Sequence, residues 1–275
     1  METKKKQTEM ATQAVTNRKK PAKRVESDRE GIREERKKLL TRKSAFAIRE
    51  SYIQLRTNLM YSMASVDESE CRVFGVTSPN PEEGKSLTAC NIAIAFAMLD
   101  KPTLLLDCDM RDPSIARLWR IRTRSGLSDL LADEGTCRVF GVEGLPLSIL
   151  PVGRIPLNPS EMLASAAFQG EMEAFRRQYA YIIIDLPPVN EVADAQIVSR
   201  LVDGMVLVVR SGSTKQRELV EAENALESAG SRVCGVVVND IDPKTGGRYG
   251  YSYGYRHGYR YNGRAGHPYG YGSQV

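Results

Sequence analysis

Short apolar runs alternate with longer amphipathic stretches along the middle of the chain. The apolar runs lie at residues 72–77, 102–107, 147–152, 181–185, 204–209 and 232–238. Most are almost continuously apolar, which is typical of strands covered on both faces. Helical periodicity predicts helices between most of these runs, at residues 86–99, 113–119, 125–132, 159–178, 192–201 and 215–229.

This alternation predicts an α/β layered domain with a mainly parallel sheet. In such sheets, ligands bind beyond the carboxyl ends of the strands. The residues that follow each apolar run are therefore the candidates for chemistry.

A further helix is predicted before the first strand, with Ser44 as its N-cap. Apolar residues recur there at intervals of three or four, which places them on one helical face. That face consists of Ile48, Tyr52, Leu55, Leu59 and Met63.

Charge divides the chain into three regions. Residues 1–43 carry a net charge of +8, residues 44–243 carry −8 and residues 244–275 carry +5. We expect a disordered basic leader at 1–43, a folded domain at 44–243 and a flexible, Gly- and Tyr-rich tail at 244–275. The basic ends suit an anionic membrane surface, nucleic acid or an acidic partner, or they only keep the chain in solution.

Composition excludes several classes of protein. The five cysteines include no CxxC pair, which argues against a disulfide framework or a zinc site. No run of about 18 apolar residues is long enough to span a membrane, and the N-terminus lacks the apolar segment of a secretory signal. We therefore expect a cytoplasmic protein.

The segment SPNPEEGKSL follows the first predicted strand and contains Gly84, Lys85 and Ser86, the ending of a phosphate-binding loop. A strand, such a loop and a helix in this order can hold phosphate oxygens with backbone N–H groups and the helix N-terminus. Lys85 would reach the β- and γ-phosphates, and the Ser86 hydroxyl would bind Mg²⁺. Alone, the segment also fits a surface turn capped by Ser86.

The same loop departs from the usual pattern. Pro79 stands in place of the opening glycine, and Pro81 has no N–H to donate. Glu82 and Glu83 lie where phosphates are expected, so we predict that both side chains point away from the phosphates.

Carboxylates follow two other predicted strands. LLLDCDMR places Asp107 at a strand end, Asp109 two residues later, and Arg111 after them, and YIIID ends in Asp185. Carboxylates this close repel one another unless a cation or proton lies between them. Mg²⁺ beside a triphosphate is the expected cation. The sequence therefore predicts an ATP–Mg²⁺ site formed by the three strand ends.

Together these motifs resemble the bacterial tyrosine kinases that control capsule and exopolysaccharide synthesis. Members of this family carry a Walker A motif, a Walker A′ motif of three apolar residues and DxDxR, and a Walker B motif of three apolar residues and Asp. Residues 84–86, 104–111 and 182–185 match them. Residues 149–163 and 182–195 are also similar to family segments. The resemblance implies a P-loop NTPase-like fold and an ATP-dependent protein-tyrosine kinase.

The nucleotide is expected to bind Gly84, Lys85, Ser86 and Leu87 at the start of a helix. Asn239, just past the last predicted strand, is expected to contact adenine, as the equivalent Asn does in related ATPases.

The resemblance and the chemistry of carboxylates assign roles to the remaining acids. Ser86 and Asp109 would hold Mg²⁺, with Asp185 reaching it directly or through water. Asp107 is the proposed base for the tyrosine hydroxyl, although the spacing leaves the roles of Asp107 and Asp109 interchangeable. Arg111 would orient this pair or bind the γ-phosphate.

The family carries an ExxRxxR sequence that packs subunits into a ring. The segment ESYIQLR supplies Glu50 and Arg56, but Ile53 replaces the middle arginine. We therefore expect a homo-oligomer of unspecified geometry, against the alternative of an ordinary amphipathic helix.

The tail contains eight of the twelve tyrosines and no acidic residue. We expect it to be the substrate of autophosphorylation. Its acceptors would be Tyr249, Tyr251, Tyr253, Tyr255, Tyr259, Tyr261, Tyr269 and Tyr271. Two alternatives are an inert tail, and a nucleic-acid-binding Arg/Gly/Tyr tail on a partitioning or division-type ATPase. Asn80 argues against that ATPase, because its relatives carry a lysine there.

The resemblance also implies partners. These are a separate membrane activator that recruits the kinase to the inner face of the membrane, protein-tyrosine substrates and a cognate phosphatase.

Overall fold

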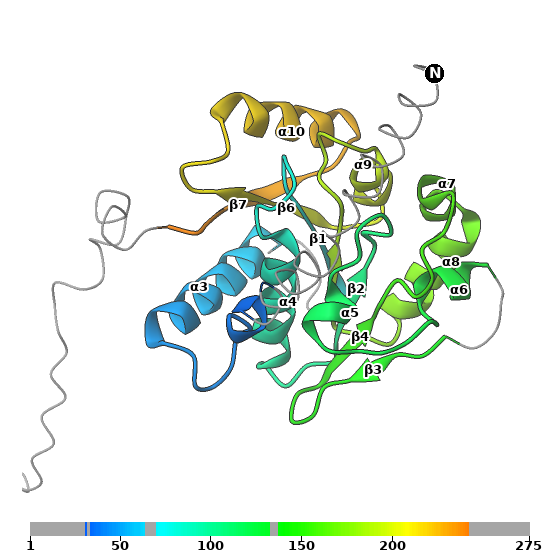
Figure 1. The fold of residues 1–275 in the computed structure, drawn as a ribbon, viewed down its shortest axis with the longest axis horizontal. Helices are drawn as coiled ribbons and strands as arrows, with labels where there is room; N and C mark the ends of the chain where they lie inside the picture. Colours follow the sequence, from blue (N-terminus) through cyan, green and yellow to red (C-terminus); the bar gives the residue numbers. More distant parts are fainter. Residues whose placement is uncertain (1–30, 32–33, 64–69, 133–136, 242–275) are drawn as a thin grey trace, which may run out of the picture. The chain divides into compact units, whose positions relative to one another are not determined.

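The computed structural model describes residues 31, 34–63, 70–132 and 137–241 (Figure 1). A seven-stranded sheet has the order β3-β4-β2-β5-β1-β6-β7. All neighbouring strands are parallel except β3 and β4. The strands are β1 (Arg72–Thr77), β2 (Thr103–Asp107), β3 (Phe140–Gly141), β4 (Leu147–Leu150), β5 (Tyr181–Asp185), β6 (Gly204–Arg210) and β7 (Val233–Asn239).

Helices cover both faces of the sheet, because alternate residues of each central strand point to opposite sides. One apolar cluster joins Leu104, Leu106 and Ile184 to the helices α6 to α10, and the other joins Phe74, Leu105 and Ile183 to α3, α4 and α5. The helices are α3 (Phe46–Ser62), α4 (Lys85–Ala97), α5 (Ile115–Leu118), α6 (Leu127–Leu131), α7 (Pro159–Leu163), α8 (Ala166–Arg176), α9 (Asp194–Ser199) and α10 (Gln216–Ser228).

The predicted fold class is confirmed, and all six predicted strands are present. The prediction of one helix over 159–178 is wrong, because Ser165 begins a new helix and its hydroxyl accepts a hydrogen bond from the Phe168 N–H. The prediction of Ser44 as N-cap of α3 is also wrong. Ala45 occupies that position, and the Ser44 hydroxyl instead accepts a hydrogen bond from the Thr41 N–H.

Residues just before α3 pack onto the domain. The buried Asn91 side chain of α4 accepts a hydrogen bond from the Leu40 N–H at 2.7 Å and donates one to the Lys38 carbonyl at 3.2 Å. Leu40 is buried, and Arg36 Nε donates to the Leu118 carbonyl at 2.7 Å. The last part of the predicted leader is thus bound to α4 and α5.

By internal contacts, the chain divides into the units Met1–Asn239 and Asp240–Val275, and only Asp240 and Ile241 of the second unit are described. The boundary predicted at residue 243 stays a prediction. Within the described ranges, no helix combines the length and the apolar character needed to cross a membrane.

Candidate active site

The loop after β1 turns sharply at Gly84, the residue before α4. Gly84 has φ +89°, a conformation that side-chain-bearing residues rarely adopt. A Cβ at this position would lie 2.1 Å from the Asn239 side-chain nitrogen. This position therefore requires glycine for its backbone angle, and any other side chain would also displace the Asn239 amide at the end of β7.

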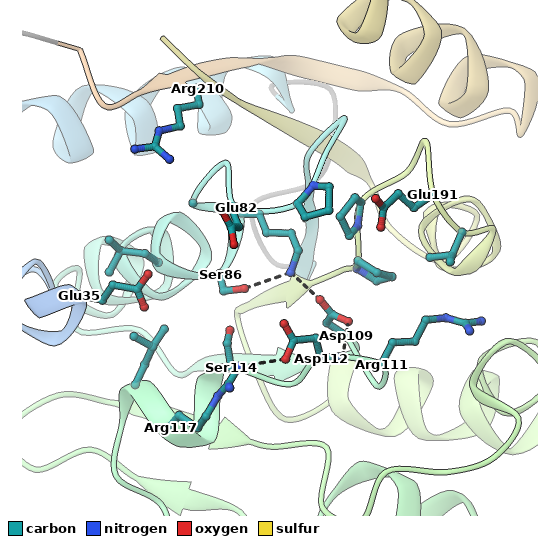
Figure 2. A pocket seen from close by; sticks show the side chains of 18 residues that line it. Glu35, Glu82, Ser86, Asp109, Arg111, Asp112, Ser114, Arg117, Glu191 and Arg210 are labelled. Carbon is teal, nitrogen blue, oxygen red and sulfur yellow. Dashed lines mark hydrogen bonds and ion pairs between the residues drawn. The ribbon is translucent and has the colours of Figure 1, made fainter. Parts of the chain in front are cut away.

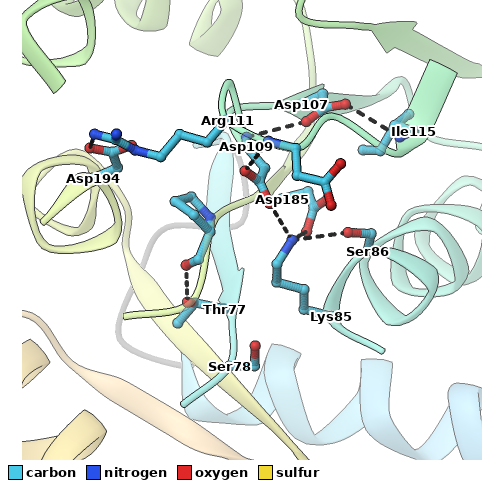
Figure 3. A network of polar contacts seen from close by, with 12 residues as sticks. Thr77, Ser78, Lys85, Ser86, Asp107, Asp109, Arg111, Ile115, Asp185 and Asp194 are labelled. Atoms are coloured by element: carbon cyan, nitrogen blue, oxygen red, sulfur yellow. Dashed lines mark hydrogen bonds and ion pairs between the residues drawn. The ribbon is translucent and has the colours of Figure 1, made fainter. Parts of the chain in front are cut away.

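Lys85 lies between two carboxylates at the first turn of α4 (Figure 3). Its Nζ is 2.6 Å from Asp109 Oδ2, 3.7 Å from Asp185 Oδ1 and 3.1 Å from Ser86 Oγ. Burial opposes the charged ammonium, but the charges of Asp185 and Asp109 outweigh burial and raise the pKa of Lys85. The structure thus brings together four residues predicted from separate parts of the sequence.

Asp107 and Asp185 lie side by side because β2 and β5 are parallel and these two residues are in register. Both are fully buried. The Asp107 oxygens accept hydrogen bonds from the backbone N–H groups of Asp109 at 3.2 Å and Ile115 at 3.3 Å. Burial, together with the charge of Asp185, raises the pKa of Asp107 well above its usual range. Asp107 therefore shapes the loop after β2 and is a stronger proton acceptor than an ordinary aspartate.

Asp185 is the least satisfied of these acids. Neither of its oxygens has a hydrogen-bond partner among the described residues, and both are buried. Burial raises the pKa of Asp185 to about 6, although the charge of Lys85 opposes this shift. Its ion-pair partner, Lys85, lies 3.7 Å from Oδ1. A buried carboxylate without hydrogen bonds is costly unless a closer cation or donor binds it.

This donor set fits Mg²⁺ bound together with phosphates. In the described part of the chain, no three His, Cys, Asp or Glu side chains form a cluster that could hold a metal. Mg²⁺ beside a nucleotide needs only one or two carboxylates, because phosphates and waters complete its octahedral coordination. Ser86, Asp109 and Asp185 offer one hydroxyl and two carboxylates around Lys85.

A pocket of about 550 Å³ opens beside this cluster (Figure 2). Lys85, Ser86, Leu87, Asp109 and Arg111 line it, but Asp107 does not. The pocket also includes Glu35, Arg117 and Arg210, which no motif of the sequence singles out. Glu35 reaches the pocket because the segment before α3 packs against α4 and α5.

Arg111 lines the pocket but does not orient the Asp107–Asp109 pair. Its guanidinium forms a two-pronged ion pair with the fully buried Asp194, at 2.8 Å from Nε and 3.1 Å from Nη2 (Figure 3). Ser160 also contacts both side chains. The side-chain hydrogen bond to Asp194 raises the pKa of Arg111. Sequence reasoning missed Asp194 and Ser160, although both lie in segments singled out by the family resemblance.

The two glutamates of the loop differ. Glu83 is buried and turns away from the pocket toward Asn80 and Thr214, as predicted. Glu82 lines the pocket with a left-handed backbone, at φ 60°. The position of Glu82 in the wall of the pocket argues against the prediction that both glutamates point away from the phosphates.

The other predicted residues lie apart from the carboxylate cluster. Asn239 Nδ2 donates to the Glu83 carbonyl at 3.0 Å, so it contacts the phosphate loop. Glu50 is exposed on α3, and Arg56 Nη1 donates to the Ala95 carbonyl of α4 at 2.7 Å. The eight tail tyrosines lie outside the described residues.

No protein-family model matches the chain. Several curated proteins, however, are similar to it in sequence. The chain is 35% identical over 204 residues to tyrosine-protein kinase YwqD of Bacillus subtilis, covering 74% of this chain and 85% of that protein. It is 33% identical over 208 residues to tyrosine-protein kinase CpsD of Streptococcus agalactiae, covering 73% of this chain and 88% of that protein.

Solved structures agree with these relatives. The crystal structure of the chimerical protein CapA2B2 matches with a TM-score of 0.69 and 33% identity over 73% of this chain and 88% of the other. The kinase domain of Escherichia coli tyrosine kinase ETK matches at 0.67 with 26% identity, over 82% and 80%. The septum site-determining protein MinD of Pyrococcus horikoshii, complexed with Mg-ADP, matches at 0.52 with 17% identity, over 63% and 75%, which shows a shared fold alone.

Proposed function

Because the chain belongs to the family of bacterial tyrosine-protein kinases, we propose that its pocket transfers the γ-phosphoryl group of ATP to tyrosine hydroxyls of its own C-terminal tail. The observation that carries the proposal is the position of Lys85, between Asp109 and Asp185 at a pocket wall. The ends of β1, β2 and β5 supply these groups, and a lysine beside metal-binding carboxylates is the kind of arrangement that stabilises phosphoryl transfer.

Each residue of the cluster has a distinct role in this proposal. Lys85 binds the β- and γ-phosphates, and it leaves its carboxylate partners when phosphate oxygens take their place. Ser86, Asp109 and Asp185 hold Mg²⁺, which neutralises charge on the phosphates when bound. Asp185 is fully buried, and its oxygens have no hydrogen bond among the described residues and only the 3.7 Å ion pair with Lys85, which supports its assignment to the metal.

Asp107 is the proposed base that takes the proton of the tyrosine hydroxyl. A phenol has a pKa of about 10, and the raised pKa of Asp107 makes its carboxylate a better acceptor than an ordinary aspartate. Because Asp107 is fully buried, residues of the loop after β2 have to move before a hydroxyl reaches it. Asp109, which lines the pocket, is the alternative base.

Arg111 takes a supporting part in this proposal. Its ion pair with Asp194 ties the loop after β2 to α9. Asn239 borders the phosphate loop, which is compatible with the adenine contact expected for it. That contact remains part of the proposal.

The tail is the proposed acceptor because it combines tyrosines with basic charge. Mass spectrometry after incubation with ATP and Mg²⁺ tests this. We expect phosphate on several tyrosines between residues 249 and 271, and on none after incubation with ADP. An unmodified tail in protein that phosphorylates other tyrosines would remove the tail from the proposal.

By family membership we propose a role in the control of capsular or other extracellular polysaccharide synthesis. A separate membrane activator would recruit the kinase to the inner face of the membrane, and a phosphatase would reverse the modification. We also propose a homo-oligomeric ring. Glu50 is exposed and available for such a contact, whereas Arg56 bonds within its own subunit.

The ATPase alternative with a nucleic-acid-binding tail has less support. The likeness to MinD concerns the fold alone, and Asn80 stands where such ATPases carry a lysine. A gel-shift assay with and without residues 244–275 separates the two functions. The kinase proposal expects no tail-dependent shift at physiological salt.

A further inference from the structure

The loop that carries Lys85 is fastened by one buried carboxylate. Glu83 is 3% exposed, and its oxygens accept hydrogen bonds from the Asn80 N–H at 2.9 Å and the Asn80 side-chain amide at 3.1 Å. The Thr214 hydroxyl, from the turn between β6 and α10, donates a third. No lysine or arginine of the described residues pairs with Glu83 in an ion pair.

A second set of contacts extends this network to α10 and β7. The Asn80 side-chain amide also donates to Glu218 Oε2 at 3.0 Å, and Glu218 accepts the Lys215 N–H at the same distance. The Asn239 amide donates to the Glu83 carbonyl. The phosphate loop is therefore bonded to elements far away in the sequence, namely the β6–α10 turn, the first turn of α10 and the end of β7.

The presence of a glutamate at position 83 needs an explanation, because a buried carboxylate beside a phosphate site costs free energy in two ways. It loses water, and it repels bound phosphate. Three donors replace the lost water, and the side chain turns away from the pocket. The result is a geometric restraint, because three donors from two different parts of the chain hold the two oxygens of one buried side chain.

The phosphate loop needs restraint from side chains because its own backbone offers few N–H groups that could form restraining hydrogen bonds. Pro79 replaces the opening glycine, and neither Pro79 nor Pro81 has an N–H. The positive φ of Glu82 is a strained conformation that surrounding contacts have to maintain. Glu83 and Asn80 lie on either side of this strained segment and bond to each other across it.

We propose that Glu83 is a positioning residue for nucleotide binding, which acts with Asn80 and Thr214 to hold the phosphate loop in its binding shape. In this role the side-chain clamp replaces the opening glycine. The clamp acts through the backbone of Gly84 and Lys85, and Glu83 itself does not touch the nucleotide. The inference rests on the proposed nucleotide site.

The test measures ADP affinity by titration calorimetry, together with kinase kinetics, on the full chain. Glu83→Ala removes the acceptor of three hydrogen bonds, so we expect ADP to bind about 10- to 100-fold more weakly. The KM for ATP should rise similarly, while kcat at saturating ATP changes less than about threefold, because the clamp acts on binding and not on chemistry. Glu223→Ala is the matched control, since Glu223 is exposed on α10.

Two further variants distinguish a specific loss of ADP affinity from a general loss of folding stability. Thr214→Val removes the donor to Glu83 and also the acceptor of the Arg210 N–H. We expect an intermediate loss of ADP affinity and a melting temperature lowered by no more than a few degrees. Asn80→Ala combined with Glu83→Ala should cost less affinity than the two single losses multiplied together, because the two residues share one contact, while Asn80 keeps a separate bond to Glu218 in the single Glu83 variant.

The outcomes separate two kinds of failure. Wild-type protein that does not bind ADP would contradict the proposed function. Wild-type protein that binds ADP, with Glu83→Ala and Thr214→Val binding it equally well, would overturn the clamp. A loss of kcat without a loss of affinity would overturn it too.

Discussion

At the scale of single residues, the three aspartates of the site differ in how many hydrogen-bond donors they have. Asp107 is satisfied by two backbone N–H groups, and Asp109 by Lys85. Asp185 is equally buried but has no hydrogen-bond partner among the described residues. Such an imbalance is typical of sites that a ligand completes.

Asp185→Asn should stabilise the nucleotide-free protein while abolishing phosphoryl transfer. The folded-state pKa of about 6 lies above the usual 3.8, so this group favours folding below that usual value, and its contribution is lost as pH rises through about 6. Calorimetry should therefore show a melting temperature a few degrees above wild type at about pH 7.5, and this difference should shrink as pH falls and vanish only below about pH 3.8. A variant less stable than wild type at the higher pH would contradict this.

Glu82→Gln should tighten nucleotide binding, opposite to the effect expected at Glu83. Its side chain lines the pocket, so removing the charge removes repulsion of the phosphates. We expect ADP to bind about two- to fivefold more tightly by calorimetry at low salt, with the gain shrinking as salt increases. Weaker binding would show that Glu82 assists the nucleotide.

The positions of some site residues could be predicted from the sequence, and those of others could not. Lys85, Asp109 and Asp185 were predictable, because parallel strands bring their carboxyl ends to one edge of the sheet. The partner of Arg111 was not predictable, because Asp194 lies 83 residues away on a short helix with no pattern that links the two. The orientation of Glu82 depends on a positive φ that no local motif specifies.

At the element scale, the apolar runs specified the sheet well, because buried parallel strands have the clearest sequence pattern. The two-residue β3 was missed, since so short an edge strand has no periodicity. The segment before α3 was also missed as part of the domain. Its attachment depends on Asn91, a single polar residue within an otherwise apolar stretch of α4.

Leu40→Ala tests whether this segment contributes to stability. Leu40 is 4% exposed, so its truncation should cost about 2–3 kcal/mol, or roughly 5–10 °C in melting temperature. Leu157→Ala is the matched control because that side chain is 103% exposed and should have almost no effect. Equal melting temperatures for the two variants would mean that the segment is not stably bound.

At the scale of the whole molecule, the predicted domain and its predicted tail carry net charges of opposite sign. Residues 44–243 carry −8 and residues 244–275 carry +5. Each phosphate adds roughly −1.5 to −2, so a few modifications would reverse the charge of the tail. This favours docking of the bare tail and release of the modified tail.

Autophosphorylation should therefore depend on ionic strength. Raising salt from about 50 mM to about 500 mM shortens the Debye length from roughly 14 to 4 Å, and we expect a severalfold drop in the initial rate of tail phosphorylation at saturating ATP. Phosphorylation of an uncharged tyrosine peptide serves as the control and should change little. Equal salt dependence for both substrates would argue against charge-driven docking.

Lys85 and the carboxylates around it form the proposed centre of phosphoryl transfer. The most direct measurement is incorporation of labelled γ-phosphate into tyrosine by wild type and by Lys85→Met, which removes the ammonium and preserves much of the apolar stem. We predict ready labelling of the wild type and a loss of about 100-fold or more in the variant at an unchanged circular dichroism spectrum. Equal labelling of the two proteins would contradict the assignment of the site.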